Sequence, residues 1–489
     1  MKPPHNTPAH VLSTVIMATM FSGCSAGPDF IRPAVPDVSR YTTTALPEHT
    51  ASAPVLLGDV QRFSTDVEVK EQWWRALGSP QLDALVERAL QASPTVVAAQ
   101  ATLRQAQELA SAQAGVTSYP QLDIGFTTQR QRFSPGALGQ ETDAREFNLF
   151  NANVGVRYTL DLAGGNRRAL EALVARAEYR RYELTAARLS LVGNTVNTAV
   201  TQARLAGQIQ ATETLLGAQE EQLQTTIDRV RLGQAAESEV WALQTQIEQT
   251  RSTLPPLRKQ HQQSTHLLAV LTGQEPGVAT LPTFTLSDFT LPPELPLIIP
   301  SILVRRRPDI QAAESLLHAA NAEYGVAVAK LYPQLDLRAS LASQALSAGA
   351  LFGGGSAIWS VVGQVTQPLF NLRLPAEKRA ALAAFDAAAA NYQNVVLEAL
   401  RNVADILRAV EHDAHTLAAL AAADAAAQDS LQSVQRQYAL GAASYVQLLI
   451  AQQAAQHTSL NIVAAQAQRL LNSAALQQAM GGGISEDRT

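Results

Sequence analysis

The sequence predicts an internally duplicated, mainly α-helical protein with a smaller β portion. A five-residue segment, Tyr-Pro-Gln-Leu-Asp at residues 119–123, recurs unchanged at residues 332–336. Residues 376–440 contain neither Gly nor Pro, which is typical of one very long helix. Between the helical stretches, polar and apolar residues alternate as they do in β-strands. Together these patterns indicate two copies of one order of elements: helix, strand pair, long helix, turn and second helix.

The N-terminal segment reads as a secretory signal. Residues 1–23 hold one cation, Lys2, no acidic residue, and an apolar run from Val11 to Phe21 that is too short to span a membrane. The order Phe21-Ser22-Gly23-Cys24 resembles the bacterial lipobox, in which the cysteine is acylated and becomes the mature N-terminus. The alternative is an ordinary signal peptide followed by an incidental cysteine. No later segment is apolar over about 18 residues, so any membrane crossing requires strands in a closed barrel.

Two glycine pairs define the repeat more finely. Leu232-Gly233 recurs as Leu440-Gly441, and Thr272-Gly273 is matched by Met480-Gly481 at the same spacing. Each copy therefore has a turn and a helix end at corresponding places.

The long helices carry a coiled-coil pattern. Apolar side chains follow each other every three or four residues along the second long helix, which is typical of a coiled-coil seam; they are Leu382, Phe385, Ala389, Tyr392, Val396, Leu400, Val403, Leu407, Val410, Ala414 and Leu417. About 65 residues in one helix would extend for about 100 Å, far beyond an ordinary globular helix. The first half repeats this pattern over residues 166–232 and 234–272, where Pro255-Pro256 is expected to break or kink the returning helix.

Four strands are expected, two in each half. They cover residues 121–134, 147–162, 334–347 and 356–370. Strands of this length suit an outer-membrane barrel, but four cannot close one, so other chains must supply the rest. Aromatic residues are 5% of the chain, too few for a large barrel made wholly from it.

These elements divide the chain into six segments. They are a signal peptide (1–23), an N-terminal extended segment (24–78), a first repeat (79–273), a linker (274–307), a second repeat (308–481) and a tail (482–489). The Pro-rich stretches 28–54 and 276–300 are interpreted as extended linkers that wrap the outside.

Several motifs resemble the lipoprotein branch of the TolC-like outer-membrane efflux family. They are Gly23-Cys24-Ser25-Ala26-Gly27-Pro28-Asp29-Phe30 with Pro33 and Pro36; Trp73-Trp74 with Leu77, Pro80 and Leu82; Arg306-Arg307-Pro308-Asp309-Ile310 with Ala313-Glu314; and Gln367-Pro368-Leu369-Phe370-Asn371. The resemblance implies a lipid-anchored homotrimer in the bacterial outer membrane, with a shared twelve-stranded barrel and an α-helical tunnel that extends into the periplasm. It also implies two partners, a periplasmic adaptor and an inner-membrane pump, often of the resistance-nodulation-division type.

The resemblance also suggests site residues at the helix turns. It implies that Arg229, Leu232 and Gly233 lie at one periplasmic tip that meets the adaptor, and that Arg436, Leu440 and Gly441 lie at the other. From the residues alone, the glycines need only be helix stops, and the two interpretations are compatible.

A gate is expected just beyond the second tip. The resemblance assigns it to Tyr438, Val446, Gln447 and Ile450, and related channels carry acidic residues where Gln447 and Ile450 stand here. We therefore expect a gate closed by apolar contact and amide hydrogen bonds, although these residues could equally pack only between helices. Glu237 and Glu239, at the start of the first returning helix, are expected to be solvated there and to favour the helix dipole.

The sequence offers few residues for catalysis, metal binding or nucleic-acid binding. A single Cys excludes a disulfide framework and a thiolate metal cluster, and a net charge of −5 argues against nucleic acid as a partner. His412, Asp413 and His415 lack a metalloprotease spacing and are interpreted as a solvated helix face. The Arg305–Arg307 cluster is expected to form the turn before the second repeat's first helix. We expect no enzyme activity, no metal and no cofactor.

Three function classes remain open at this point. The first is a passive duct of a tripartite efflux pump, which conducts drugs or other small molecules outward. A duct for type I protein secretion is the nearest alternative, and only the identity of the partner separates the two. A periplasmic coiled-coil scaffold without a pore is third, and it would leave the alternating strands unexplained.

Overall fold

The computed structural model describes residues 25–67, 69–134 and 143–482, in two compact units. One unit comprises Met1–Pro33, Leu103–Arg180 and Ala313–Tyr392, and the other comprises Ala34–Thr102, Arg181–Ala312 and Gln393–Thr489. Each unit thus draws residues from both repeats. Within the described ranges, none of the helices is both long and apolar enough to cross a membrane.

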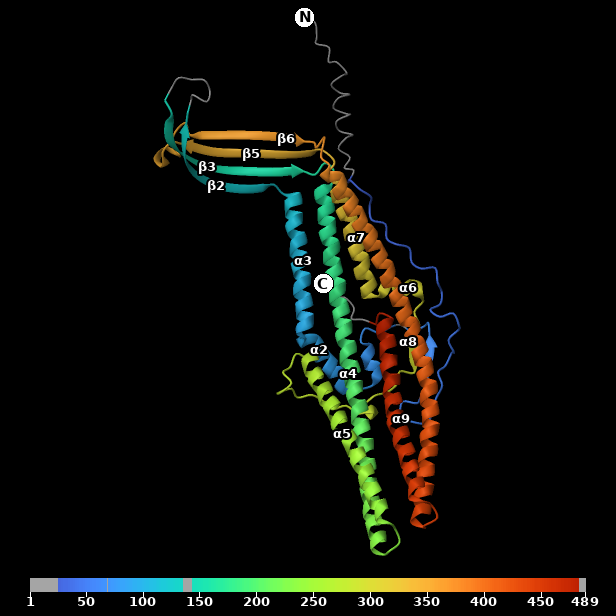
Figure 1. The fold of residues 1–489 in the computed structure, drawn as a ribbon. Coiled ribbons are helices and arrows are strands. Elements are labelled where there is room, and N and C mark those ends of the chain that lie inside the picture. Colours follow the sequence, from blue (N-terminus) through green and yellow to red (C-terminus); the bar gives the residue numbers. More distant parts are fainter. Residues whose placement is uncertain (1–24, 68, 135–142, 483–489) are drawn as a thin grey trace. The chain divides into compact units, whose positions relative to one another are not determined.

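The first unit contains an antiparallel sheet of four strands (Figure 1). Its order is β2 (Gln121–Phe133), β3 (Arg145–Leu160), β5 (Gln334–Ala345) and β6 (Ala357–Thr366), which confirms the predicted strand pairs. The last strand ends at Thr366 rather than at Phe370, because Pro368 has no N–H to continue the ladder.

One face of this sheet is apolar and exposed. Ile124 pairs with Val154, Val154 with Leu341, and Leu341 with Trp359, so one row of large apolar side chains crosses all four strands. Of these, Ile124 is 85% exposed and Trp359 75%. The next register row, on the opposite face, is Asp123, Gly155, Ser340 and Ser360 and carries no large apolar side chain. An exposed apolar face on a sheet is unusual in a water-soluble protein and requires a partner or lipid to cover it.

Two helix pairs dominate the second unit, although residues 165–180 of one long helix and 373–392 of the other belong to the first unit. Helix α4 (Gly165–Arg231) is followed by α5 (Glu237–Leu271), and α8 (Arg373–Ala439) by α9 (Tyr445–Ala479). Figure 1 shows α5 beside α4 and α9 beside α8, each pair joined by a short turn. Both long helices are therefore single, as predicted. The expected seam of α8 is buried from Tyr392 to Leu417 apart from the half-buried Leu400, whereas Leu382 is exposed.

Of the break or kink expected at Pro255-Pro256, the break is wrong, because α5 is one continuous helix through both prolines. Ion pairs tie α5 to α4 on either side of them, Arg251 to Glu220 at 2.8 Å and Arg258 to Glu213 at 2.7 Å. Contacts on both sides keep the helix on its path, although each proline removes one backbone hydrogen bond.

The remaining helices flank these elements. They are η1 (Trp73–Leu77), α2 (Pro80–Ala92), α3 (Pro94–Ser118), η3 (Leu286–Asp288), α6 (Pro300–Arg306), α7 (Pro308–Ala329) and η4 (Ala348–Ala350). Of the arginine cluster expected to form a turn, only Arg307 does so: it caps the end of α6 in an extended conformation, and α7 begins at Pro308. For Arg305 and Arg306 the expectation is wrong, because both lie in the last turn of α6.

The Pro-rich stretch 276–300 was expected to be an extended linker on the outside of the protein, but part of it is buried. Phe284 and Phe289 are buried with Trp73 and Trp74 in the main core of the second unit. In addition, β4 (Glu294–Pro296) pairs in parallel with β1 (Arg62–Ser64), a two-stranded sheet that the sequence did not predict. The linker is therefore part of the core, and it fixes the N-terminal segment to the helices.

Candidate functional site at the helix turns

The four helices α4, α5, α8 and α9 end in the same way. At the first turn, Gly233 has φ of +70°, its N–H donates to Val230 O, and the N–H of Gln234 donates to Arg229 O. Gly441 has φ of +75° and makes the equivalent bonds at the second turn. Gly273 and Gly481 repeat this geometry at the ends of α5 and α9. This is the Schellman motif, in which a left-handed residue satisfies the last carbonyls, and glycine adopts that conformation without strain.

The two turns present apolar side chains to solvent. Leu232 is 71% exposed and Leu440 is 85% exposed, and the glycine after each is exposed too. Arg436 is also exposed, whereas Arg229 is half-buried with its guanidinium 4.7 Å from the centre of the Tyr438 ring. The structure therefore places Leu232, Leu440 and Arg436 at the surface and Arg229 in an internal contact.

Tyr438 connects the two helix pairs. It lies in the last turn of α8, is 5% exposed, and donates its hydroxyl hydrogen bond to Glu239 Oε2 at 2.7 Å in the first turn of α5. Burial, followed by the bond to this carboxylate, raises the pKa of Tyr438 above its ordinary value, so the hydroxyl stays protonated at neutral pH. Glu239 is thus not merely solvated at a helix start, as the sequence suggested, but holds the end of α8.

The other three predicted gate residues lie in the first two turns of α9. Val446 and Ile450 are 60% and 61% exposed, and they are four residues apart, so they share one face of α9. Gln447 completes a capping box, in which its N–H donates to Ser444 Oγ at 3.3 Å and its Oε1 accepts from Ser444 N at 2.7 Å. The start of α9 is therefore capped by its own side chains, and it presents two aliphatic side chains to solvent.

Sequence reasoning missed Trp241. This side chain is 61% exposed on the second turn of α5, close along the chain to the first helix turn. A solvent-exposed Trp beside exposed leucines is typical of a protein contact surface, and the residue type near a predicted turn was the available signal.

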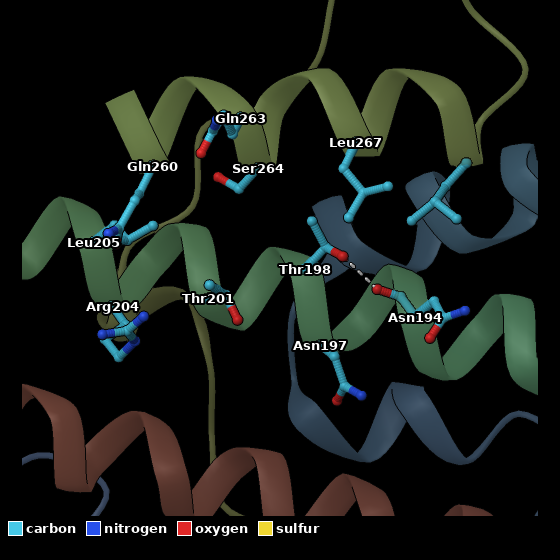
Figure 2. A pocket seen from close by; sticks show the side chains of 11 residues that line it. Asn194, Asn197, Thr198, Thr201, Arg204, Leu205, Gln260, Gln263, Ser264 and Leu267 are labelled. Atoms are coloured by element: carbon cyan, nitrogen blue, oxygen red, sulfur yellow. Dashed lines mark hydrogen bonds between the residues drawn. The ribbon is translucent and has the colours of Figure 1, made fainter. Parts of the chain in front are cut away.

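A polar groove of about 570 Å³ lies between α4 and α5. Figure 2 shows the side chains that line it, among them Asn194, Asn197 and Thr201 on α4 and Gln263 and Ser264 on α5. Its one cation, Arg204, donates to Gln208 Oε1 at 3.2 Å, and no carboxylate lines the groove. Amides and hydroxyls without an acid and base pair provide no catalytic centre.

The lipidation candidate, Cys24, lies outside the described residues. The segment that follows it is held firmly within the first unit by the buried Arg168. Its guanidinium donates to Ala26 O at 3.2 Å and forms ion pairs with Asp29 at 2.6 Å and Glu171 at 2.7 Å. Phe30 stacks on His318 at 4.4 Å, and His318 contacts Glu171 at 2.8 Å. Burial acts to raise the pKa of Glu171, but the bonds from Arg168 and His318 outweigh it and lower the pKa.

The histidines of α8 are exposed, as expected. His412 and His415 face solvent, whereas Asp413 is half-buried and accepts a hydrogen bond from Asn472 at 2.5 Å. Over the described ranges, no three His, Cys, Asp or Glu side chains come together as metal ligands would.

Comparison with known proteins places this geometry in a family. A family model described as outer membrane efflux protein matches residues 85–274 and 299–482. A pyoverdine export outer membrane protein of Pseudomonas aeruginosa, OpmQ, is 30% identical over 432 residues, which cover 87% of this chain and 90% of the relative. A probable efflux pump outer membrane protein of Pseudomonas putida, TtgC, is 28% identical over 487 residues, covering 97% and 96% of the two chains.

Solved structures agree with the sequence comparison. The outer-membrane channel OprN superimposes with a TM-score of 0.83 at 26% identity, over 94% of this chain and 100% of that chain. The outer membrane protein VceC of Vibrio cholerae gives a TM-score of 0.78 at 25% identity, over 84% and 99%.

Proposed function

This chain belongs to the outer membrane efflux protein family and is the outer membrane component of an efflux system, and we propose that it works there as a homotrimeric, passive duct for small molecules. Each protomer gives its four strands to one shared barrel and its long helices to a periplasmic tunnel. As a transport component it performs no catalysis, and the energy for export comes from an inner-membrane transporter of the resistance-nodulation-division type.

The exposed apolar rows of the sheet carry this proposal. Ile124, Val154, Leu341 and Trp359 form one continuous row, and Leu122, Val156, Ala339 and Val361 form a parallel one. Side chains of this kind on one face, with polar ones on the other, are what a strand needs between lipid and an aqueous lumen. The outer edges, β2 and β6, are free for pairing with copies of the same chain.

Lipid anchoring at Cys24 fits the N-terminal contacts. A chain that is fixed to the membrane by its first mature residue needs a firm link between that residue and the folded body. Arg168 supports such a link, because its side chain is 5% exposed and binds Ala26, Gly27 and Asp29. Acylation then adds a hydrophobic attachment to the strands' own contact with lipid.

The helix turns are the proposed contact with the periplasmic adaptor. Both turns expose a leucine directly before a left-handed glycine, so each turn offers one exposed apolar side chain to a helical partner. Trp241 extends this surface along α5. On the lumen side of this contact surface, the Tyr438–Glu239 bond and the start of α9 form the gate. Its lumen-facing side chains are Val446, Gln447 and Ile450.

A double substitution tests the adaptor contact. Leu232→Asp with Leu440→Asp places a negative charge at both turns. We expect drug resistance and adaptor cross-linking to fall to the level of a deletion strain. The trimer should survive, because neither side chain is buried. Val278→Asp is the matched control, since this valine is 78% exposed but distant along the chain from both turns. Resistance that stays normal in the double variant would contradict the proposal.

A further inference from the structure

The apolar face of the four-stranded sheet carries its charges at one end only. This face comprises every second residue of each strand, in register with the row that begins at Ile124. Among the strand residues that the structure describes, three on this face are charged: Arg130, Arg132 and Glu146. The other charged strand residues all belong to the opposite face; they are Asp123, Arg145, Arg157, Asp336 and Arg338.

The three charged residues lie at the hairpin end of β2 and β3. Helix α3 ends at Ser118 and β2 begins at Gln121, so Arg132 is at the end of β2 that is remote from the helix (Figure 1). On the apolar face β2 presents Leu122, Ile124, Phe126 and Thr128 in turn, and then the two arginines. Arg132 is about 20 Å along the strand from Phe126. In the proposed barrel this end is the outer surface, because the long helices extend into the periplasm.

One carboxylate faces two guanidinium groups in this cluster. Arg132 stands directly opposite Glu146 in the register, and Arg130 Nη2 lies 3.1 Å from Glu146 Oε2. The cluster therefore has a net charge of +1 in each protomer. The side chains of Arg130 and Glu146 are 74% and 52% exposed, so an anionic group can approach them from outside.

The neighbouring hairpin adds apolar side chains at the same end of the sheet. Residues 339–372 contain no Asp, Glu, Lys, Arg or His. In the loop between β5 and β6, Leu346 is 64% exposed and Phe352 is 84% exposed. The loop is tied to the apolar face, because Ser343 belongs to that face and its hydroxyl donates to Leu351 O. The hairpin end thus combines cations with apolar side chains.

We propose that Arg130 and Arg132 bind the phosphate groups of lipid A in the outer leaflet, with its acyl chains against the apolar band below them. Arginine is the side chain best suited to phosphate, since its planar guanidinium donates two parallel hydrogen bonds. Clustered cations beside a membrane-facing apolar surface are typical of contact with anionic head groups. An arginine that faces lipid is tolerated near the membrane surface but not at the bilayer centre, which agrees with its place at the strand end.

The opposite end of the same face favours the outer leaflet over the inner one. At the helix end this face finishes in Tyr158, Leu160, Leu335 and Val365, and none of these is charged. A general affinity for anionic lipid would call for cations at both ends. The inference rests on the proposed barrel and names the lipid that its outer rim binds.

Binding of lipid A to the purified, full-length protein tests the site. We expect Arg130→Gln with Arg132→Gln to weaken binding about tenfold in native mass spectrometry, because two charge-assisted contacts to phosphate are lost. Arg145→Gln is the matched control, since Arg145 is exposed at the same end but belongs to the opposite face, and it should bind as the wild type does. Unchanged binding by the double variant, or an equal loss in the control, would overturn the proposal.

Glu146→Gln gives a change of the opposite sign. Its carboxylate competes with phosphate for the two arginines, so we expect this variant to bind lipid A about threefold more tightly than the wild type does. Weaker or unchanged binding would count against the site. Phosphatidylglycerol is the probe for a general anionic-lipid surface, and wild-type affinity for it as high as for lipid A would overturn the assignment.

Planar bilayers separate this inference from the proposed function. A wild-type protein that conducts current, but binds lipid A no better than the double variant does, overturns the lipid site alone. A wild-type chain that neither assembles nor conducts overturns the proposed duct and this inference with it.

Discussion

Asp413 on α8 and Arg469 on α9 are charged residues whose pKa values are shifted by burial. Arg469 is 2% exposed and donates to the carbonyl oxygens of Leu57 at 2.8 Å and Asp59 at 3.0 Å. Burial lowers the pKa of Arg469. Burial raises the pKa of Asp413, and the hydrogen bond from Asn472 and the charge of Arg469 only partly offset this effect. The ionised form of Asp413 therefore opposes folding.

This balance predicts a pH-dependent gain from Asp413→Asn. Because the folded-state pKa of Asp413 lies above its unfolded value, its contribution to stability is full in acid and falls as pH rises through the folded pKa. Asn imitates the protonated form. We expect the variant to unfold a few degrees higher than wild type at pH 7, and the difference to vanish at about pH 3. Thermal unfolding at both pH values measures it.

Asp429→Asn is the control for that experiment, because Asp429 is exposed on the same helix. A stability gain for Asp413→Asn that is equal at both pH values, or a loss at pH 7, would contradict the explanation.

Sequence reasoning identified residues well where one residue type has one conformational use. The four glycines at helix ends were found in this way, and all four have positive φ. It could not find the long-range contacts of Arg469 or Arg168. Although Arg168 also pairs with Glu171 three residues on, both arginines bind backbone carbonyl oxygens more than a hundred residues away along the chain. No local spacing signals such a contact. Trp241 was missed for a different reason: exposure depends on tertiary packing, which one sequence window does not show.

At the scale of elements, Gly and Pro marked the boundaries of the long helices almost to the residue. The same rule failed at Pro255-Pro256, where ion pairs on both sides keep α5 continuous. The short parallel pairing of β1 with β4 was also missed. Strands of three residues carry no measurable alternation, and their partners lie far apart in the sequence.

Two glycines in these helices should respond in opposite ways to the same methyl group. Gly441 has φ of +75° and open space around its Cα, so Gly441→Ala is strained only by its backbone conformation and should cost about 1–2 kcal/mol. Gly217 lies inside α4, also in open space, and Gly217→Ala should stabilise by about 0.5–1 kcal/mol. Chemical denaturation of the two variants measures both changes.

The sign of each change is the decisive result. If both substitutions destabilise the protein, space rather than φ controls these positions. If Gly441→Ala is neutral, the left-handed turn at the second tip is not the conformation in solution.

At the scale of the whole molecule, three features of the described residues fit the proposed trimer. The sheet exposes apolar rows, its edge strands β2 and β6 pair on one side only among the described residues, and one face of α5 is exposed where the equivalent face of α9 is buried. The sequence anticipated the first of these through strand length and number. It could not anticipate the third, because only the contacts of α4 with α9 reveal which faces the duplication leaves open.

The proposed trimer predicts how the proposed gate responds to cations. In that trimer, the copies of Gln447 and Ile450 add no carboxylate to the pore, and Glu239 is engaged by the hydroxyl of Tyr438, so a trivalent cation should block single-channel current only weakly. Gln447→Glu with Ile450→Glu would place six carboxylates around one axis, and Glu preserves the capping box with Ser444. We expect the variant to be blocked at roughly a hundredfold lower cation concentration, because clustered charges in a confined pore attract a multivalent ion strongly. The isosteric single change Gln447→Glu should give an intermediate effect. Current through planar bilayers measures the block, and equal sensitivity of the wild type and the double variant would place these side chains outside the conducting path.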